Sequence, residues 1–108
     1  MTKTSQIRPE DVVAQAQRLR ELRATTGLSQ EKFAESVGLG YGQWSNFESA
    51  RQRIGIDAAL TLTRKMFVSL DWIYTGNGMQ YLPPDLREAL RRVQETEATA
   101  GQKPLKRR

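Results

Sequence analysis

Residues 28–48 constrain the fold most, because they predict two short helices joined by a tight turn. Ser29 is a good N-cap for the first of these helices. Gly38 tolerates positive φ and so allows a sharp turn before a second helix over residues 41–48. The expected inner faces are Phe33, Ala34 and Val37 before the turn, and Trp44 and Phe47 after it. The segment therefore predicts two helices that pack closely across the turn.

Helical spacing of apolar residues recurs along the chain, whereas no alternating run between turn residues indicates a strand. We expect an all-α fold: an arm over residues 1–9, a compact helical domain over 10–79 and an extension over 80–108. Its helices are predicted from near Pro9 to Gly27, at 29–37, 41–48 and 56–67, and from Ser69 to near Gly76. The extension is expected to form a helix over about 84–97 and a basic flexible tail. Further core positions are expected at Val12, Ala16, Leu19, Leu22 and Thr26, at Ala59, Leu60 and Thr63, and at Met66 or Phe67.

Composition narrows the function. Cysteine and histidine are both absent from the 108 residues, which removes disulfides, thiolate zinc sites and the commonest general base. We therefore expect no enzyme, no cofactor and no metal. The net charge of +5 suits a polyanionic partner. No apolar run is long enough for a bilayer, and residues 1–8 lack a secretory signal, so a cytoplasmic protein without a membrane partner is expected.

The spacing within residues 29–48 is that of a helix-turn-helix motif, whose second helix lies in the major groove of DNA. Three stretches extend the pattern: RLRELRATTGLSQEKFAESVG at 18–38, WSNFESARQRI at 44–54 and SLDWIYTGN at 69–77. Together, residues 15–77 resemble the Xre/Cro/phage-repressor family. The resemblance implies a five-helix repressor-like DNA-binding domain. It also implies a sequence-specific regulator of transcription that binds double-stranded DNA, as a dimeric repressor at a palindromic or pseudopalindromic operator.

The resemblance implies that the third helix reads bases. The residues that it assigns to base edges are Tyr41, Gln43, Ser45 and Asn46. Asn46 is the strongest of these candidates, because an asparagine amide matches the adenine edge with two hydrogen bonds. The alternative for each is an ordinary solvated surface residue.

Other family positions imply contacts that carry no sequence information. The residues assigned to DNA phosphates are Gln30, Gly40, Arg51 and Arg53, and a structural ion pair is expected between Arg23 and Glu48. The alternatives are a routine first-turn residue at position 30 and two unpaired surface charges at 23 and 48. Four further cations are expected to be plain surface charges: Arg18, Arg20, Arg64 and Lys65.

Two positions depart from the family pattern. Ala50 stands where the family usually has glycine, which suggests a different backbone turn into the loop over residues 51–55. Gly42 stands where longer polar residues are common in the third helix. It either permits a close approach to DNA or reads nothing, and the second is favoured.

Assembly is expected to use apolar residues outside the monomer core, because one recognition helix contacts too few base pairs to select a genomic site. The predicted homodimer interface is formed by Leu70, Ile73, Tyr74, Leu86, Leu90 and Val93, with the extension folded back toward the fifth helix. The alternative function is an antitoxin-type module that neutralises a partner toxin or another protein, for which residues 84–108 would serve.

Overall fold

All the regular structure in residues 9–102, the part of the chain that the computed structural model describes, is helical. The elements are α1 (Pro9–Ala24), α2 (Gln30–Val37), α3 (Tyr41–Glu48), α4 (Ile56–Met66), α5 (Leu70–Thr75), the 3-10 turn η1 (Met79–Tyr81) and α6 (Pro84–Gln102). The predicted all-α class is therefore confirmed. None of these helices combines the length and the apolar character that a membrane span requires.

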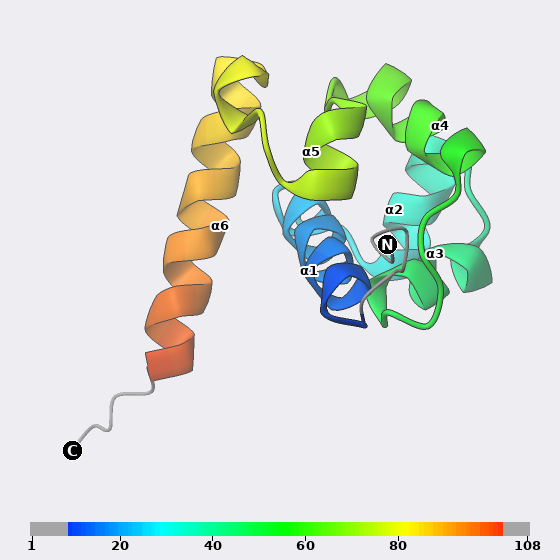
Figure 1. Ribbon diagram of the computed structural model, residues 1–108, viewed down its shortest axis with the longest axis horizontal. Helices are drawn as coiled ribbons and strands as arrows, with labels where there is room; N and C mark the ends of the chain where they lie inside the picture. The colour runs from blue at the N-terminus through cyan, green and yellow to red at the C-terminus, as the bar shows by residue number, and fades with distance from the viewer. Residues whose placement is uncertain (1–8, 103–108) are drawn as a thin grey trace, which may run out of the picture.

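Helix α1 lies at the centre of the arrangement, where it packs against α3, α5 and α6. Contacts also join α2 with α3, α2 with α4, and α4 with α5. Figure 1 shows α6 as a separate layer, on the other side of α1 from α2, α3 and α4. Helix α6 contacts α1, and its Leu90 lies in one hydrophobic core with Trp72 and Ile73 of α5, so the extension folds back onto the domain that contains the fifth helix.

An aromatic cluster joins α2 and α3. The rings of Phe33 and Trp44 lie 4.8 Å apart, and Phe47 meets Trp44 edge-on at 6.2 Å. All three are buried, as the spacing predicts. The same core takes in Leu82 and Leu90 from beyond α5, so the extension contributes to the hydrophobic core of the domain.

Helix α1 is shorter than the expected stripe. It ends at Ala24, and Thr26 is exposed in the following turn instead of extending the buried face. The hydroxyls of Thr25 and Thr26 donate to the carbonyls of Leu22 and Arg23 at 2.6 Å, and the backbone N–H groups of the same two threonines donate to these carbonyls as well. The chain then turns at Gly27, with φ 75°. Local hydrogen bonding of the threonines therefore competes with further helix.

Helix α4 differs from the expectation in its end and in its buried face. Phe67 is not helical: it ends α4 in a left-handed conformation with φ 64° and is 69% exposed. The fully buried residues of α4 are Ala58, Ala59 and Leu62, whereas Leu60 and Thr63 are half-buried. The helix is rotated so that the apolar positions 58 and 62 face the core. Its packing against α2 and α5 sets this rotation, which the α4 sequence alone does not determine.

Helix α6 continues past the predicted end at residue 97 as far as Gln102, so the flexible tail expected from residue 98 is wrong for 98–102. Residues 103–108 lie outside the described range. Beyond Val93 the apolar stripe stops, but local pairs at helical spacing join Arg91 to Glu88 and Glu95. A helix continues here without an apolar face, which periodicity alone does not detect.

Candidate nucleic-acid interface

The turn between α2 and α3 follows from local capping. The Ser29 hydroxyl accepts a hydrogen bond from the backbone N–H of Lys32 at 3.2 Å. At the other end Gly38 has φ 81°, and the next N–H, of Leu39, donates to the Ala34 carbonyl at 2.9 Å. Helix α3 then begins after Gly40, with the predicted bounds Tyr41–Glu48.

A buried carboxylate holds α3 against α1 and α2. Glu48 is 2% exposed and accepts four hydrogen bonds. Arg23 of α1 donates from Nε at 2.6 Å and from Nη2 at 3.1 Å. Gln30 of α2 donates from Nε2 at 2.8 Å, and Trp44 of α3 itself donates from Nε1 at 2.6 Å. The ion pair expected between Arg23 and Glu48 is thus present, as the centre of a larger network that joins three helices.

The backbone at the end of α3 is held as well. Arg20 donates from Nη1 to the Glu48 carbonyl at 2.6 Å. Arg18 donates from Nε and Nη2 to the Ile73 carbonyl on α5, at 3.2 and 3.1 Å. Burial lowers the pKa of Arg18. The expectation that Arg18 and Arg20 are plain surface charges is therefore wrong, because both reach helix-end carbonyls. Arg64 and Lys65 are exposed, as expected.

The four residues expected to read bases lie on the outer face of α3 and differ in their exposure to solvent. Tyr41 and Gln43 are exposed, whereas Ser45 and Asn46 are half-buried. Within residues 9–102 the Asn46 side-chain amide makes no hydrogen bond. Its backbone carbonyl accepts from the N–H groups of Arg51 and Gln52 at 3.0 and 3.2 Å. Asn46 therefore has a fixed backbone and an amide that no described residue engages.

The N-terminus of α3 differs from those of its neighbours in charge. The first turns of α2, α4, α5 and α6 each carry an acidic residue, whereas that of α3 carries none. Its N-cap, Gly40, is exposed and supplies no side chain. The positive end of the α3 dipole and its first N–H groups are thus left available to an anion. At Gly42 a Cβ would meet nothing within 4 Å, so packing does not require glycine there.

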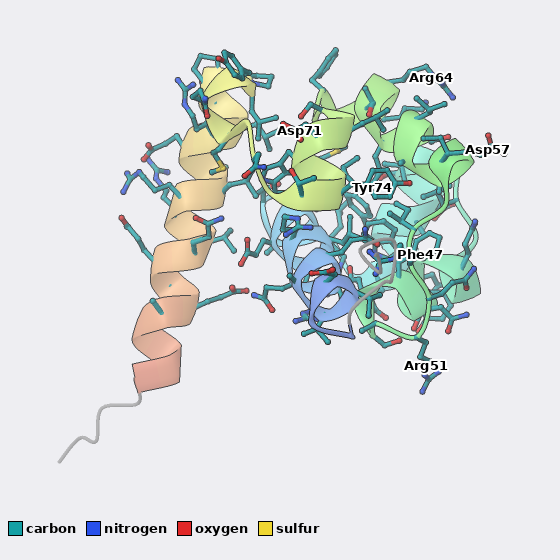
Figure 2. The ribbon with its side chains drawn as sticks, in the orientation of Figure 1. Phe47, Arg51, Asp57, Arg64, Asp71 and Tyr74 are labelled. Carbon is teal, nitrogen blue, oxygen red and sulfur yellow. The ribbon has the colours of Figure 1, made fainter. Side chains whose placement is uncertain are left out.

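The loop after α3 begins with a strained residue. Ala50 has φ 65°, the left-handed conformation that glycine adopts at no steric cost. The expectation that alanine changes the turn is therefore wrong: the backbone keeps a conformation suited to glycine. Arg51 is exposed, and Figure 2 shows its side chain projecting away from the body of the molecule. Arg53 is half-buried, and its Nη2 is enclosed without a partner in the described part of the chain.

The predicted dimer interface is largely used within the monomer. Ile73 and Leu90 are 0% exposed in the core, so they are corrected from interface to core residues. The other four predicted residues, Leu70, Tyr74, Leu86 and Val93, are half-buried. Tyr74 also donates its hydroxyl to the Ile54 carbonyl at 2.9 Å. The apolar stripe of the extension is covered only in part by its own chain, because α6 packs on α1 but leaves Leu86 and Val93 half-buried.

Two contributors to the site escaped the sequence interpretation. Trp44 was expected only in the core, but its indole N–H also binds Glu48, which lies four residues along the same helix. The sequence prediction also does not include Gln15, which is 1% exposed and accepts a hydrogen bond from the Ile54 N–H at 2.8 Å. A polar residue between apolar positions of the α1 stripe was the available signal for a buried hydrogen bond.

Comparison with known proteins agrees with this geometry. Residues 16–66 match the model of a family described as a helix-turn-helix domain. A curated relative from Bacillus subtilis (strain 168), named uncharacterized HTH-type transcriptional regulator YobD, is 33% identical over 57 residues. The match covers 53% of this chain and 51% of the relative, so the chain spans about half the relative's length. No solved structure shows significant similarity to the chain.

Proposed function

We propose, from the helix-turn-helix domain formed by residues 16–66, that this protein is a sequence-specific regulator of transcription that binds double-stranded DNA. In this proposal α3 lies in the major groove, and the protein acts in the cytoplasm by occupying a site, without catalysis or a cofactor. The resemblance to the Xre/Cro/phage-repressor family extends the proposal to repression.

The observation that carries the proposal is a rigidly held α3 with a polar outer face and no acid in its first turn. Base readout requires that side chains meet base edges at fixed positions, and the hydrogen bonds to Glu48 supply that rigidity from α1 and α2. An acid in the first turn would repel the phosphates that flank the groove. Asn46 is proposed as the main base reader, with Tyr41, Gln43 and Ser45 beside it.

Phosphate contacts are proposed on both sides of α3. Arg51 is the best placed, because it is exposed and its backbone N–H is bonded to the α3 carbonyl of Asn46. Gly40 offers its backbone at the helix N-terminus. Gln30 is proposed to contact a phosphate with the second N–H of its side-chain amide, since the amide nitrogen already donates one hydrogen bond to Glu48. Arg53 contributes from a half-buried position.

A homodimer at a palindromic operator belongs to the same proposal. One helix of this length reaches only a few base pairs, and two such helices about 34 Å apart read successive turns of the major groove. With Ile73 and Leu90 in the core, the dimer surface is proposed around the half-buried residues Leu70, Leu86 and Val93.

Selection of bound sequences from random duplex DNA tests the proposal with the full chain. We expect an enriched motif with two-fold symmetry, and an affinity that falls as the salt concentration rises. Replacing Asn46 by alanine is expected to relax the preference at one base position and to cost about 1–3 kcal/mol. Arg51→Ala is the matched control, because it should weaken binding to all sequences nearly equally. A library without enrichment and a flat salt response would refute the proposal and favour the protein-interaction alternative.

A further inference from the structure

The loop between α3 and α4 is held at a single residue, Ile54, by two helices that are distant in sequence. Its N–H donates to Gln15 Oε1 of α1 at 2.8 Å, and its carbonyl accepts from the Tyr74 hydroxyl of α5 at 2.9 Å. The Ile54 side chain is 2% exposed in the core. Both backbone polar groups and the side chain of one loop residue are therefore fixed.

The other end of the loop is held by α3. The N–H of Ala50 donates to Phe47, and those of Arg51 and Gln52 donate to the Asn46 carbonyl. Arg51 thus lies between an anchor on α3 and the anchor at Ile54. Since the loop is short and starts from the strained Ala50, releasing either anchor gives the Arg51 backbone new freedom.

Burying Gln15 lowers the stability of the fold, so packing alone does not explain a glutamine at this position. It is 1% exposed, and its Nε2 has no hydrogen-bond partner among residues 9–102. A buried amide whose two N–H donors are both unused is worse for stability than a fully satisfied group. What glutamine provides at this position is the hydrogen bond from its side-chain oxygen to the Ile54 N–H of the loop.

Tyr74 also uses a polar side-chain group to hold the backbone of Ile54. Figure 2 shows its place at the inner side of α5, far from the projecting Arg51 side chain. Burial raises the pKa of Tyr74, and the nearby Arg53 charge opposes that rise. The hydroxyl is therefore protonated near neutral pH and available as a donor.

We propose that Gln15 and Tyr74 are positioning residues for DNA binding: through Ile54 they fix the loop over residues 50–55, so that Arg51 meets the phosphate backbone in one register with α3. This inference rests on the proposed DNA-binding function. Neither residue touches DNA, and neither affects which bases are read.

The test compares Tyr74→Phe, which removes only the hydroxyl, with Tyr81→Phe, a tyrosine that is 82% exposed. Affinity for the selected duplex is measured over a range of salt concentrations. Tyr74→Phe should weaken binding about five- to tenfold and reduce the magnitude of the logarithmic salt slope by about one. The selected sequence should stay the same. Tyr81→Phe should match the wild type in every respect.

A double-mutant cycle separates positioning from general destabilisation. In an Arg51→Ala background, Tyr74→Phe should cost less than about twofold, because the contact that it positions is already absent. Gln15→Met should give the same non-additive pattern, which covers the case that one variant folds poorly. An equal loss with and without Arg51, or a Tyr74→Phe protein that binds like the wild type, overturns the positioning role alone. A wild-type protein that selects no sequence overturns the proposed function as well.

Discussion

Replacing Glu48 by glutamine is the sharpest test of what holds α3 against α1 and α2. The two side chains have nearly the same shape, so the change leaves no cavity and isolates the hydrogen bonds. The carboxylate accepts four bonds, from Arg23, Gln30 and Trp44. An amide keeps one acceptor oxygen and turns the other into a donor. Two of the four donors then face an N–H₂ group and lose their acceptor.

The magnitude follows from the kind of bond that is lost. Hydrogen bonds to a charged group contribute about 1.5–3 kcal/mol each, so two of them amount to about 3–6 kcal/mol. The Arg23 side chain is 24% exposed, which lets water replace part of its lost partner. We therefore expect the free energy of unfolding to fall by about 3 kcal/mol, near the lower end of that range. Domains of this size are stable by only about 5–15 kcal/mol, so the variant should fold but unfold much more readily.

Urea unfolding followed by circular dichroism measures this effect. A loss of 3 kcal/mol should lower the urea midpoint by about 1–3 M at the usual slopes. The control is Glu35→Gln on the exposed face of α2, which should change the stability by less than about 0.5 kcal/mol. If Glu48→Gln stays within that same limit, the desolvation cost of the buried carboxylate cancels its hydrogen bonds, and the reasoning fails.

Three further predictions concern other sites. Burial, and then repulsion from Glu21, raise the pKa of Glu97. The folded protein therefore favours the protonated carboxyl group, and this contribution to folding stability is fully present below the ordinary pKa of 4.5 and is lost as pH rises through the folded-state pKa. Glu97→Gln should therefore be more stable than the wild type at pH 7, by about 0.5 kcal/mol or less because residue 97 is exposed, and equal to it at pH 3.5 in urea titrations. Ala50→Gly removes a left-handed alanine and should raise stability by about 0.5–1 kcal/mol; a lower thermal midpoint would contradict the assigned strain. Gly42→Ala should add about 1 kcal/mol in the same thermal assay, with unchanged DNA affinity if that position reads nothing.

Where the determinants of structure are local, the sequence was sufficient to predict the fold. The bounds of α2 and α3 follow from a serine cap before α2, a glycine turn between the two helices and two inward aromatic residues on α3, all within residues 29–48. The same holds for α5, whose N-cap Ser69 accepts from the Trp72 N–H and whose C-cap Gly76 has φ 82°. Such signals act over four or five residues and need no knowledge of tertiary contacts.

Polar contacts between distant helices were beyond this kind of reasoning. Nothing in the sequence near Arg20 specifies that its partner is the Glu48 carbonyl, 28 residues away. The pair of Arg23 and Glu48 was reached only through resemblance to a family. The packing partner of α6 was equally unpredictable. Helical periodicity shows that the apolar stripe of α6 has to be buried, but it does not identify the helix that covers the stripe. Its burial on α1 removed Leu90 from the predicted dimer surface.

Polar side chains of α1 hold both the extension and the end of α3. Gln17 donates to Glu97 of α6 at 2.7 Å and accepts from Arg20, which in turn donates to the carbonyl at the end of α3. A second link runs from Gln94 of α6 to Glu21 at 3.1 Å. Because a side-chain amide has a donor and an acceptor at opposite corners, the bond from Gln17 to α6 also fixes the oxygen that orients Arg20. The packing of α6 and the end of α3 therefore share hydrogen bonds as well as a hydrophobic core, and residues after α5 are structurally continuous with the helix-turn-helix domain.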